Sequence, residues 1–247
     1  MGIEERIAYL RQQAKIKPRK KWYQKWWVIL LLLFLAGLIM LGIETGRYIV
    51  DLAEQMDVEQ IKANQTAQNV INNSNQKLIE GLNNYWTGTS TPKVTIVEFS
   101  DFVCPYCQNS FSTISEIKSK YKNDVKIIYR DFIGHDNSLN LALAGRCAGE
   151  QNNFWLMHDR IFSTSEPENL TPEKVIGYAT QIGLDTKKFT DCLNSQKYLN
   201  LIRKDATDAA SLGVTKTPTW FINGEKIEGE IPINLFEQYI KKLLNIN

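Results

Sequence analysis

Cysteine, histidine and proline are scarce in this chain of 247 residues, with four, two and seven of each. Four cysteines are too few for a miniprotein held together by disulfides. No internal repeat and no phosphate-binding glycine motif is present, which excludes repeat proteins and proteins with the common nucleotide-binding motifs. The composition, 43% hydrophobic and 23% charged, is too balanced for a disordered or collagen-like chain, and the length allows one domain of about 150 residues plus attachments.

The folded part of the chain also lacks a positive charge excess. Residues 1–43 hold eight of the 29 basic residues and only two of the 27 acidic ones, which leaves a net charge of −4 on residues 44–247. A nucleic-acid-binding domain needs a basic surface on its folded part. Nucleic acid is therefore not an expected partner.

One long hydrophobic run stands near the N-terminus, at residues 26–43, where eighteen residues carry no charge. As a helix this run is about 27 Å long, close to the roughly 30 Å hydrocarbon core of a bilayer. Basic residues precede it and acidic residues follow it, so the positive-inside rule places the N-terminus in the cytoplasm. We expect residues 1–25 to form a cytoplasmic basic tail and 26–43 a single-pass anchor in the cell (inner) membrane, with the remainder in the periplasm or outside the cell.

A cleaved signal peptide is the main alternative to an anchor, because both begin with a basic region and an apolar region. The long basic region, the long apolar run and the lack of a small-x-small cleavage site at Leu41 to Gly46 favour the anchor. A buried helix of a soluble protein fits poorly with the opposite charge on the two flanks. The first two interpretations both place the rest of the chain outside the cytoplasm.

Residues 44–90 are polar and rich in asparagine, with helical spacing of the apolar positions but no sustained heptad. We interpret the segment as a polar helical stalk or linker that holds a domain away from the bilayer. A partly ordered linker, interrupted near Asn72 to Asn75, and a weak dimerising helix are the alternatives.

Residues 91–247 read as an α/β domain. Apolar runs predict strands at 94–99 and 125–132, and the Asn223-Gly224 turn predicts a hairpin of 219–222 and 225–228. The predicted helices are 105–121, 137–151, 154–162, 171–181, 195–212 and 232–244. The order is strand, helix, strand, helical insert at about 137–213, hairpin and helix.

The sequence Cys104-Pro105-Tyr106-Cys107 lies where the first of these strands ends and the first helix begins. Unpaired backbone N–H groups and the helix dipole at a helix start stabilise a thiolate, and a second cysteine one turn on is able to close a disulfide with it. The pattern is typical of a thiol–disulfide exchange site. A zinc site is the alternative, but the remaining cysteines and both histidines have no ligand-like spacing, so no metal is expected.

Three stretches of the sequence together resemble the DsbA family of thiol:disulfide oxidoreductases, in the thioredoxin superfamily. These are Val97-Glu98-Phe99-Ser100-Asp101-Phe102-Val103-Cys104-Pro105-Tyr106-Cys107, then Cys147-Ala148-Gly149-Glu150-Gln151 with Phe154-Trp155 and His158-Asp159, and Gly213 to Gly224 with Lys216-Thr217-Pro218-Thr219. The resemblance implies a thioredoxin fold with a helical domain inserted after the second strand. It also implies that Cys104 is the nucleophile and Cys107 its buried partner, that no organic cofactor is needed, and that a quinone-linked membrane protein of the DsbB type reoxidises the pair.

Three further residues are candidates for the site. Glu98 shares a strand face with Val94 and Ile96, so burial is expected to desolvate its carboxyl and make it a proton acceptor for Cys107; a strand-end glutamate that reaches water is the alternative. The resemblance implies a cis bond at Pro218, although X-Pro bonds are usually trans. It also implies that the Thr217 backbone pairs with an extended substrate, and Pro105 and Tyr106 complete the expected substrate-binding surface.

Cys147 and Cys192 are the second pair of cysteines. A structural disulfide is our first expectation, because an oxidising compartment favours bonding; two separate buried thiols and a shuttle role are the alternatives. His158 and Trp155 lie in an apolar run and are expected in the core or along a groove, and His135 is expected in a loop with no assigned task.

Together these features predict an extracytoplasmic oxidoreductase that forms disulfides in exported proteins that contain cysteines. A membrane-anchored reductase or isomerase is the alternative within the same chemistry, because Cys-Pro-Tyr-Cys does not fix the direction of electron flow. A non-catalytic thioredoxin-like scaffold or chaperone is the alternative from another class.

Overall fold

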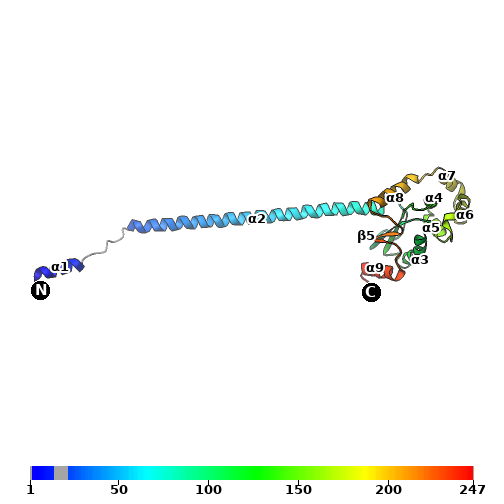
Figure 1. The fold of residues 1–247 in the computed structure, drawn as a ribbon. Helices are drawn as coiled ribbons and strands as arrows, with labels where there is room; N and C mark the ends of the chain where they lie inside the picture. Colours follow the sequence, from blue (N-terminus) through cyan, green and yellow to red (C-terminus); the bar gives the residue numbers. More distant parts are fainter. Residues whose placement is uncertain (1, 14–21, 247) are drawn as a thin grey trace. The chain divides into compact units, whose positions relative to one another are not determined.

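The structure is a computed structural model that describes residues 2–13 and 22–246. The chain falls into two units, residues 1–68 and 69–247. The first contains helix α1 (Ile3–Gln13) and most of helix α2 (Trp22–Glu80), drawn in blue and cyan in Figure 1. The basic residues between 14 and 21 lie outside the described residues.

Helix α2 contains an apolar stretch, Trp26–Met56, that is long enough to cross a membrane. It includes the anchor predicted at 26–43. The helix passes through Asn72–Asn75 without a break, so the interruption considered there is absent. Its last turn contains Ile79, which is 8% exposed and packs with Val97 and Phe221 of the sheet.

The second unit is built on a five-stranded mixed sheet with the order β1-β3-β2-β4-β5. Its strands are β1 (Trp86–Gly88), β2 (Val94–Ser100), β3 (Val125–Asp131), β4 (Thr219–Ile222) and β5 (Glu225–Glu228). Strands β2 and β3 are parallel, while the other neighbours are antiparallel. Continuous apolar runs in β2 and β3 are those expected for central strands that are covered on both faces.

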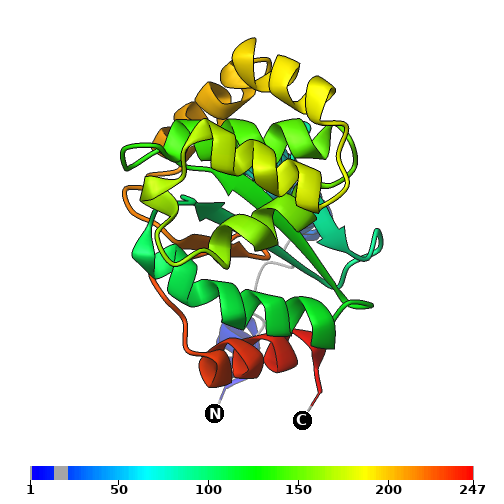
Figure 2. The same cartoon turned by 90° about the vertical axis from the view of Figure 1, so that its right-hand side faces the viewer.

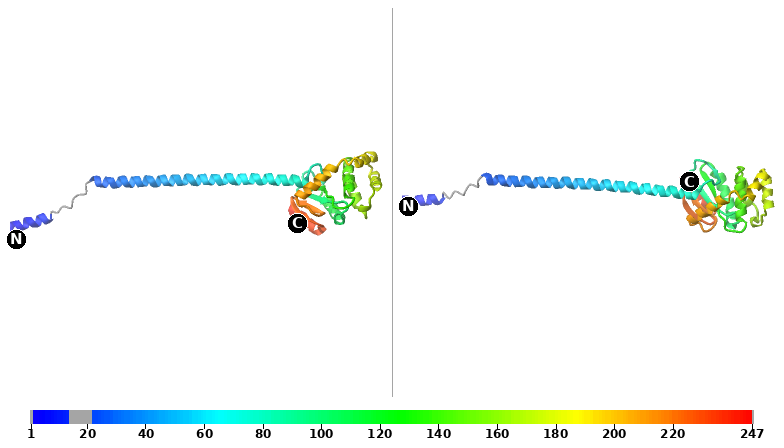
Figure 3. Two further views of the ribbon diagram at one scale, coloured as in Figure 1. Left: turned by 45° about the horizontal axis from the view of Figure 1, so that its top comes forward. Right: turned by 90° about the horizontal axis from the view of Figure 1, so that it is seen from above.

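Helices cover both faces of this sheet, as the views in Figures 2 and 3 show. Helices α3 (Pro105–Lys120) and α9 (Ile233–Leu244) pack on one face, through Ile117 and Phe236 among others. The opposite face packs against the end of α2 and against α8 (Leu199–Ser211). The remaining helices of the insert are α4 (Ser138–Gly149), α5 (Phe154–Phe162), the short 3-10 helix η1 (Pro167–Asn169), α6 (Pro172–Gln181) and α7 (Thr186–Asn194).

The predicted fold class, a thioredoxin-like α/β fold with a helical insert, is confirmed, but three details differ. Strand β1 lies inside the segment 44–90 that was assigned to the stalk, where it pairs with β3, so the folded domain begins earlier than residue 91. Three residues with polar neighbours give little sequence signal for a strand, because these residues become a strand only by pairing with β3. The sequence pattern also missed α7 and began α8 four residues too early, at Ser195 instead of Leu199.

Candidate active site

The two cysteines of the Cys-x-x-Cys motif lie where β2 gives way to α3. Cys104 is the N-cap residue of α3 and Pro105 its first residue, a position where the missing proline N–H costs no hydrogen bond. The Cys104 N–H donates to the Asp101 carbonyl at 3.0 Å, and the Cys104 carbonyl accepts from the Gln108 N–H at 3.0 Å. These contacts fix the sulfur at the opening turn of the helix. Both cysteines are free thiols.

The pKa values of the two thiols are shifted in opposite directions. The pKa of Cys104 is lowered to about 5, first by a hydrogen bond from the Cys107 side chain and then by groups that include the Thr217 side chain and the N–H groups of Cys107 and Tyr106, although burial opposes the shift. Burial raises the pKa of Cys107 well above its ordinary value, and the nearby Cys104 and Glu98 add to this. The Cys104 sulfur thus ionises readily, while the Cys107 sulfur keeps its proton.

Thr217 and Pro218 lie directly beside Cys104. The Thr217–Pro218 bond is cis, and the Cys104 thiol donates to the Thr217 carbonyl at 3.5 Å. This contact favours the protonated thiol, so it partly opposes the Thr217 side chain, which favours the thiolate. Tyr106 is 60% exposed, so the motif has one buried side, at Cys107, and one open side.

Glu98 lies in the middle of the sheet, beside Tyr129 of β3 and Trp220 of β4. It is 3% exposed, and burial raises the pKa of its carboxyl from 4.5 to about 7. Its charge acts on Cys107. Glu98 is therefore a desolvated carboxyl that exchanges its proton near neutral pH, and the strand-end position in water is not what the structure shows.

The buried carboxylate of Asp101, which the sequence pattern did not single out as a site residue, organises the loop before Cys104. One oxygen accepts from the Val103 N–H at 2.9 Å, and the other accepts from the Gly134 N–H at 2.9 Å and contacts Nδ1 of His135 at 2.8 Å. An aspartate that accepts from the N–H two residues on is a common turn device, and that spacing was the only signal available.

His158 belongs to the core. It is 2% exposed and packs among aromatic rings, including those of Phe102, Trp155 and Phe162. Burial lowers its pKa, although a 2.8 Å contact from Nδ1 to Asp159 opposes this. A histidine kept neutral by apolar packing has a structural task, in line with the sequence interpretation.

Cys147 and Cys192 form a disulfide between α4 and α7, with a Cα–Cα distance of 5.9 Å. Both are buried, Cys147 at 1% exposed and Cys192 at 6%. The bond joins two helices of the insert and lies within the same apolar cluster as Cys104 and Cys107.

Two buried arginines form an ionic network that the sequence analysis did not anticipate. Arg130 of β3 pairs with Asp205 at 2.9 Å and Asp208 at 2.6 Å on α8, while Arg146 of α4 pairs with Asp131 and Asp205. Arg130 also donates to the Leu78 and Ile79 carbonyls at the end of α2. The network ties three helices to one strand, and no short motif in the sequence marks it.

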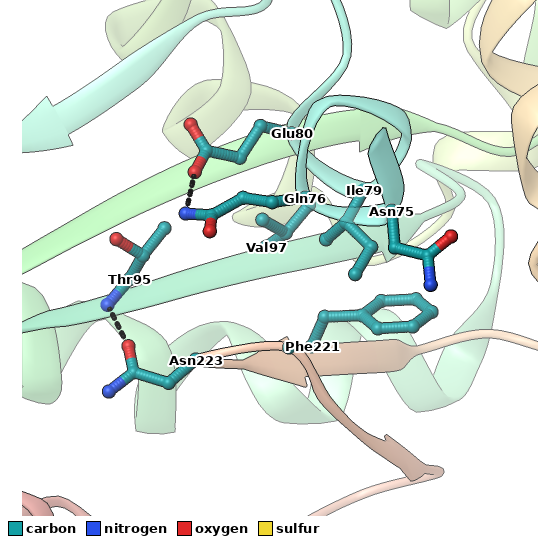
Figure 4. Close-up of a pocket in the computed structure, with 9 residues that line it drawn as sticks. Asn75, Gln76, Ile79, Glu80, Thr95, Val97, Phe221 and Asn223 are labelled. Carbon is teal, nitrogen blue, oxygen red and sulfur yellow. Dashed lines mark hydrogen bonds between the residues drawn. The ribbon is translucent and has the colours of Figure 1, made fainter. Parts of the chain in front are cut away.

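A cavity of about 450 Å³ lies elsewhere in the domain, between the end of α2 and the strands β2 and β4. Figure 4 shows the residues that line it. Polar side chains such as Gln76 and Asn223 surround apolar ones such as Val97 and Phe221, and neither cysteine of the motif lines it. Within residues 2–13 and 22–246, no group of three or more histidine, cysteine or acidic side chains is placed to hold a metal ion.

Comparison with protein families gives one match, to a model described as thioredoxin, over residues 81–242. Among curated proteins, Na⁺/H⁺ antiporters NhaA are similar over part of their length. The protein from Herminiimonas arsenicoxydans is 29% identical over 142 residues, which are 58% of this chain and 22% of the antiporter. NhaA 1 from Salinispora arenicola is 31% identical over 149 residues, again with 22% of the relative covered. The chain thus spans about a fifth of the length of these relatives.

Solved structures with the same fold include thiol-disulfide exchange proteins. The protein alpha-DsbA2 from Wolbachia pipientis has a TM-score of 0.61 at 21% identity and covers 72% of this chain and 98% of its own. Oxidised BdbD from Bacillus subtilis has a TM-score of 0.60 at 24% identity, with 65% and 92% covered. The periplasmic thioredoxin-like protein from Salmonella enterica serovar Typhimurium has a TM-score of 0.58 at 23% identity, with 70% and 97% covered.

Proposed function

Because the chain belongs to the thioredoxin family and has a DsbA-like fold, we propose that it is a membrane-anchored thiol:disulfide oxidoreductase that forms disulfides in exported proteins. One observation carries the proposal: Cys104 has a pKa lowered to about 5, while that of its neighbour Cys107 is raised. Two adjacent thiols with opposite tendencies suit an exchange site, in which one sulfur reacts and leaves as a thiolate while the other keeps its proton.

The reaction starts from the oxidised pair. A substrate thiolate attacks the Cys104 sulfur, the Cys104–Cys107 bond breaks, and the Cys107 sulfur takes a proton from Glu98. A second substrate thiolate then attacks the substrate sulfur of the mixed disulfide and releases Cys104 as a thiolate. Two electrons pass from the substrate dithiol to the enzyme pair, and the substrate leaves with a disulfide.

The low pKa of Cys104 favours the last step, since a stable thiolate is a good leaving group and makes the pair more oxidising. Substrate would lie along Thr217 and Pro218, with Pro105 and Tyr106 as the other side of the surface, and would pair with the Thr217 backbone as an added strand does. Reduced enzyme then needs an electron acceptor, for which we propose a quinone-linked membrane protein of the DsbB type. The exchange itself requires no metal and no organic cofactor.

The apolar stretch of α2 and the charge bias of its flanks support a membrane location. We propose a single-pass protein of the cell membrane with its N-terminus in the cytoplasm and the thioredoxin domain in the periplasm or outside the cell. Alkylation of Cys104 in intact cells with a membrane-impermeant reagent, after reduction of the pair with a membrane-impermeant reductant, tests this, because a cytoplasmic domain would stay unlabelled until the membrane is opened.

The decisive test is the reduction potential of the Cys104/Cys107 pair, measured against glutathione. A value near the roughly −120 mV of strong oxidants supports disulfide formation, whereas a value near the roughly −270 mV of thioredoxin supports a reductase or isomerase. A Cys107→Ala variant would identify the substrates, because Cys107 could no longer resolve the mixed disulfides that they form with Cys104. If cells keep the protein's role with serine at both 104 and 107, the protein is a scaffold and the proposal fails.

A further inference from the structure

The carboxylate of Asp101 creates an electrostatic problem for Cys104. Its side chain is fully buried, at 0% exposed, and its carboxylate accepts from the N–H of Val103, the residue before Cys104, at 2.9 Å. A buried negative charge this close disfavours a second negative charge on the sulfur. An exchange site that depends on a Cys104 thiolate therefore needs a compensating positive charge.

The described structure offers His135 as that charge. Its Nδ1 lies 2.8 Å from the Asp101 carboxylate, and its side chain is 44% exposed, so it is able to take up a proton from solvent. It lines a cavity of about 410 Å³ together with Val103 and Pro105, the neighbours of Cys104 in sequence. The Gly134 N–H, which donates to the same carboxylate at 2.9 Å, holds the His135 loop against the active-site loop.

We propose that His135 is a positioning residue for the exchange reaction: when protonated, it neutralises Asp101 and thereby favours the Cys104 thiolate. This inference rests on the proposed function and deepens it. It assigns to a loop about thirty residues downstream of the motif, at residue 135 against 104, the positive charge that Tyr106 does not provide.

The groups that face His135 agree with this assignment. They are Asp101 and Cys104 from the active-site loop, Asp136 on its own loop and Glu168 of η1. The hydrogen bond to Asp101 raises the pKa of His135, burial opposes this, and the charges of Asp101, Cys104 and Asp136 raise it further. As the pH rises through that raised pKa, the positive charge disappears and with it the help to Cys104. Hydrogen bonds within the motif remain the larger contribution to the Cys104 thiolate.

The test is a pH titration of the Cys104 thiolate by its ultraviolet absorbance, in reduced full-length protein in detergent. His135→Asn removes the charge and is expected to raise the pKa of Cys104 by about half a unit, the size expected for a partly exposed charge. That is about a threefold change in equilibrium, or about 15 mV toward a more reducing pair. His135→Arg keeps a positive charge and should restore the wild-type value. Lys93→Asn is the matched control, because Lys93 pairs with Asp124 at 2.7 Å beside the opposite end of β2.

A second measurement needs no substitution. Coupling between two sites is reciprocal, so the pKa of His135, followed by NMR of its ring, should fall by about half a unit when the Cys104 thiolate is replaced by the disulfide. The inference is overturned if the His135→Asn protein titrates like wild type or if the ring ignores the redox state. If wild-type Cys104 itself ionises like free cysteine, the proposed function fails instead.

Discussion

The molecule contains two pairs of cysteines whose surroundings differ. Cys104 and Cys107 lie three residues apart at the start of a helix, as free thiols with opposite pKa shifts. Cys147 and Cys192 lie 45 residues apart on two helices of the insert and form a disulfide. Both pairs are buried in one apolar cluster, so burial does not distinguish them. The distinction lies in the helix start, where the Cys104 sulfur accepts a hydrogen bond from the Cys107 side chain and, to a smaller extent, from the N–H groups of Cys107 and Tyr106.

The largest expected effect is the loss of exchange in Cys104→Ser. We expect the rate of substrate oxidation to fall at least ~1,000-fold, because the serine hydroxyl stays protonated at neutral pH and forms no disulfide with Cys107 or with the substrate. Oxidation of a reduced model protein with a glutathione buffer measures it. Cys192→Ser with Cys147→Ser is the control, and if that variant loses exchange to the same extent, the two pairs do not have separate tasks.

The second pair should matter for stability. Opening a loop of 45 residues costs about 4 kcal/mol in the chain-entropy model, within a usual range of about 2–4 kcal/mol. We therefore expect Cys147→Ser with Cys192→Ser to lower the free energy of unfolding by several kcal/mol, measured in urea, while folded protein still exchanges disulfides. An unchanged midpoint would show that the bond does not constrain the insert.

Glu98→Gln sharpens the comparison, because the buried carboxyl of Glu98 acts on Cys107 of the first pair. The pKa of Glu98 is raised from 4.5 to about 7, so the contribution of this group to stability is fully present below pH 4.5 and falls by about 3 kcal/mol as the pH rises to about 7. The glutamine variant should lack this fall in denaturant titrations at several pH values. Its exchange should also be slower, by on the order of 10- to 100-fold, near or below the low end for a general acid–base group. A variant with the wild-type pH dependence would place the titrating group elsewhere.

Tyr106→His tests how far the first pair is tuned by charge. Residue 106 is in the first turn of α3 and 60% exposed, so a protonated imidazole there should lower the pKa of Cys104 by about half a unit and make the pair slightly more oxidising. Thiolate absorbance and the reduction potential both report it. No movement in either would mean that the hydrogen bonds of the motif already determine the thiolate.

Much of this architecture could be predicted from the sequence, because local residue patterns determine these strands, turns and helix starts. The apolar runs of β2 and β3, the Asn223-Gly224 turn and the Thr171 N-cap before Pro172 all appear where the residues indicate. The alternation of β2 also placed Glu98 on a covered face. Each of these signals lies within a few residues of the element that it defines.

The rest depends on residues that are distant in sequence. Arg130 meets Asp205 across 75 positions, and His135 meets Asp101 across 34. In one sequence an isolated arginine or histidine reads as a solvated side chain. Strand β1 escaped for the same reason, since its three residues become a strand only by pairing with β3.

The two edge strands of the sheet are short: β1 has three residues and β5 has four. Strand β5 also carries the charged residues Glu225, Lys226 and Glu228. Long, flat, uncharged edge strands expose unpaired N–H and C=O groups, with which other chains pair and aggregate. If the protein acts on exported chains that are still unfolded, as we propose, it meets such chains constantly. The three-residue β1 and the short, charged β5 would deny them a template, and leave the backbone beside Thr217 as the proposed place where an extended substrate chain is accepted and then released.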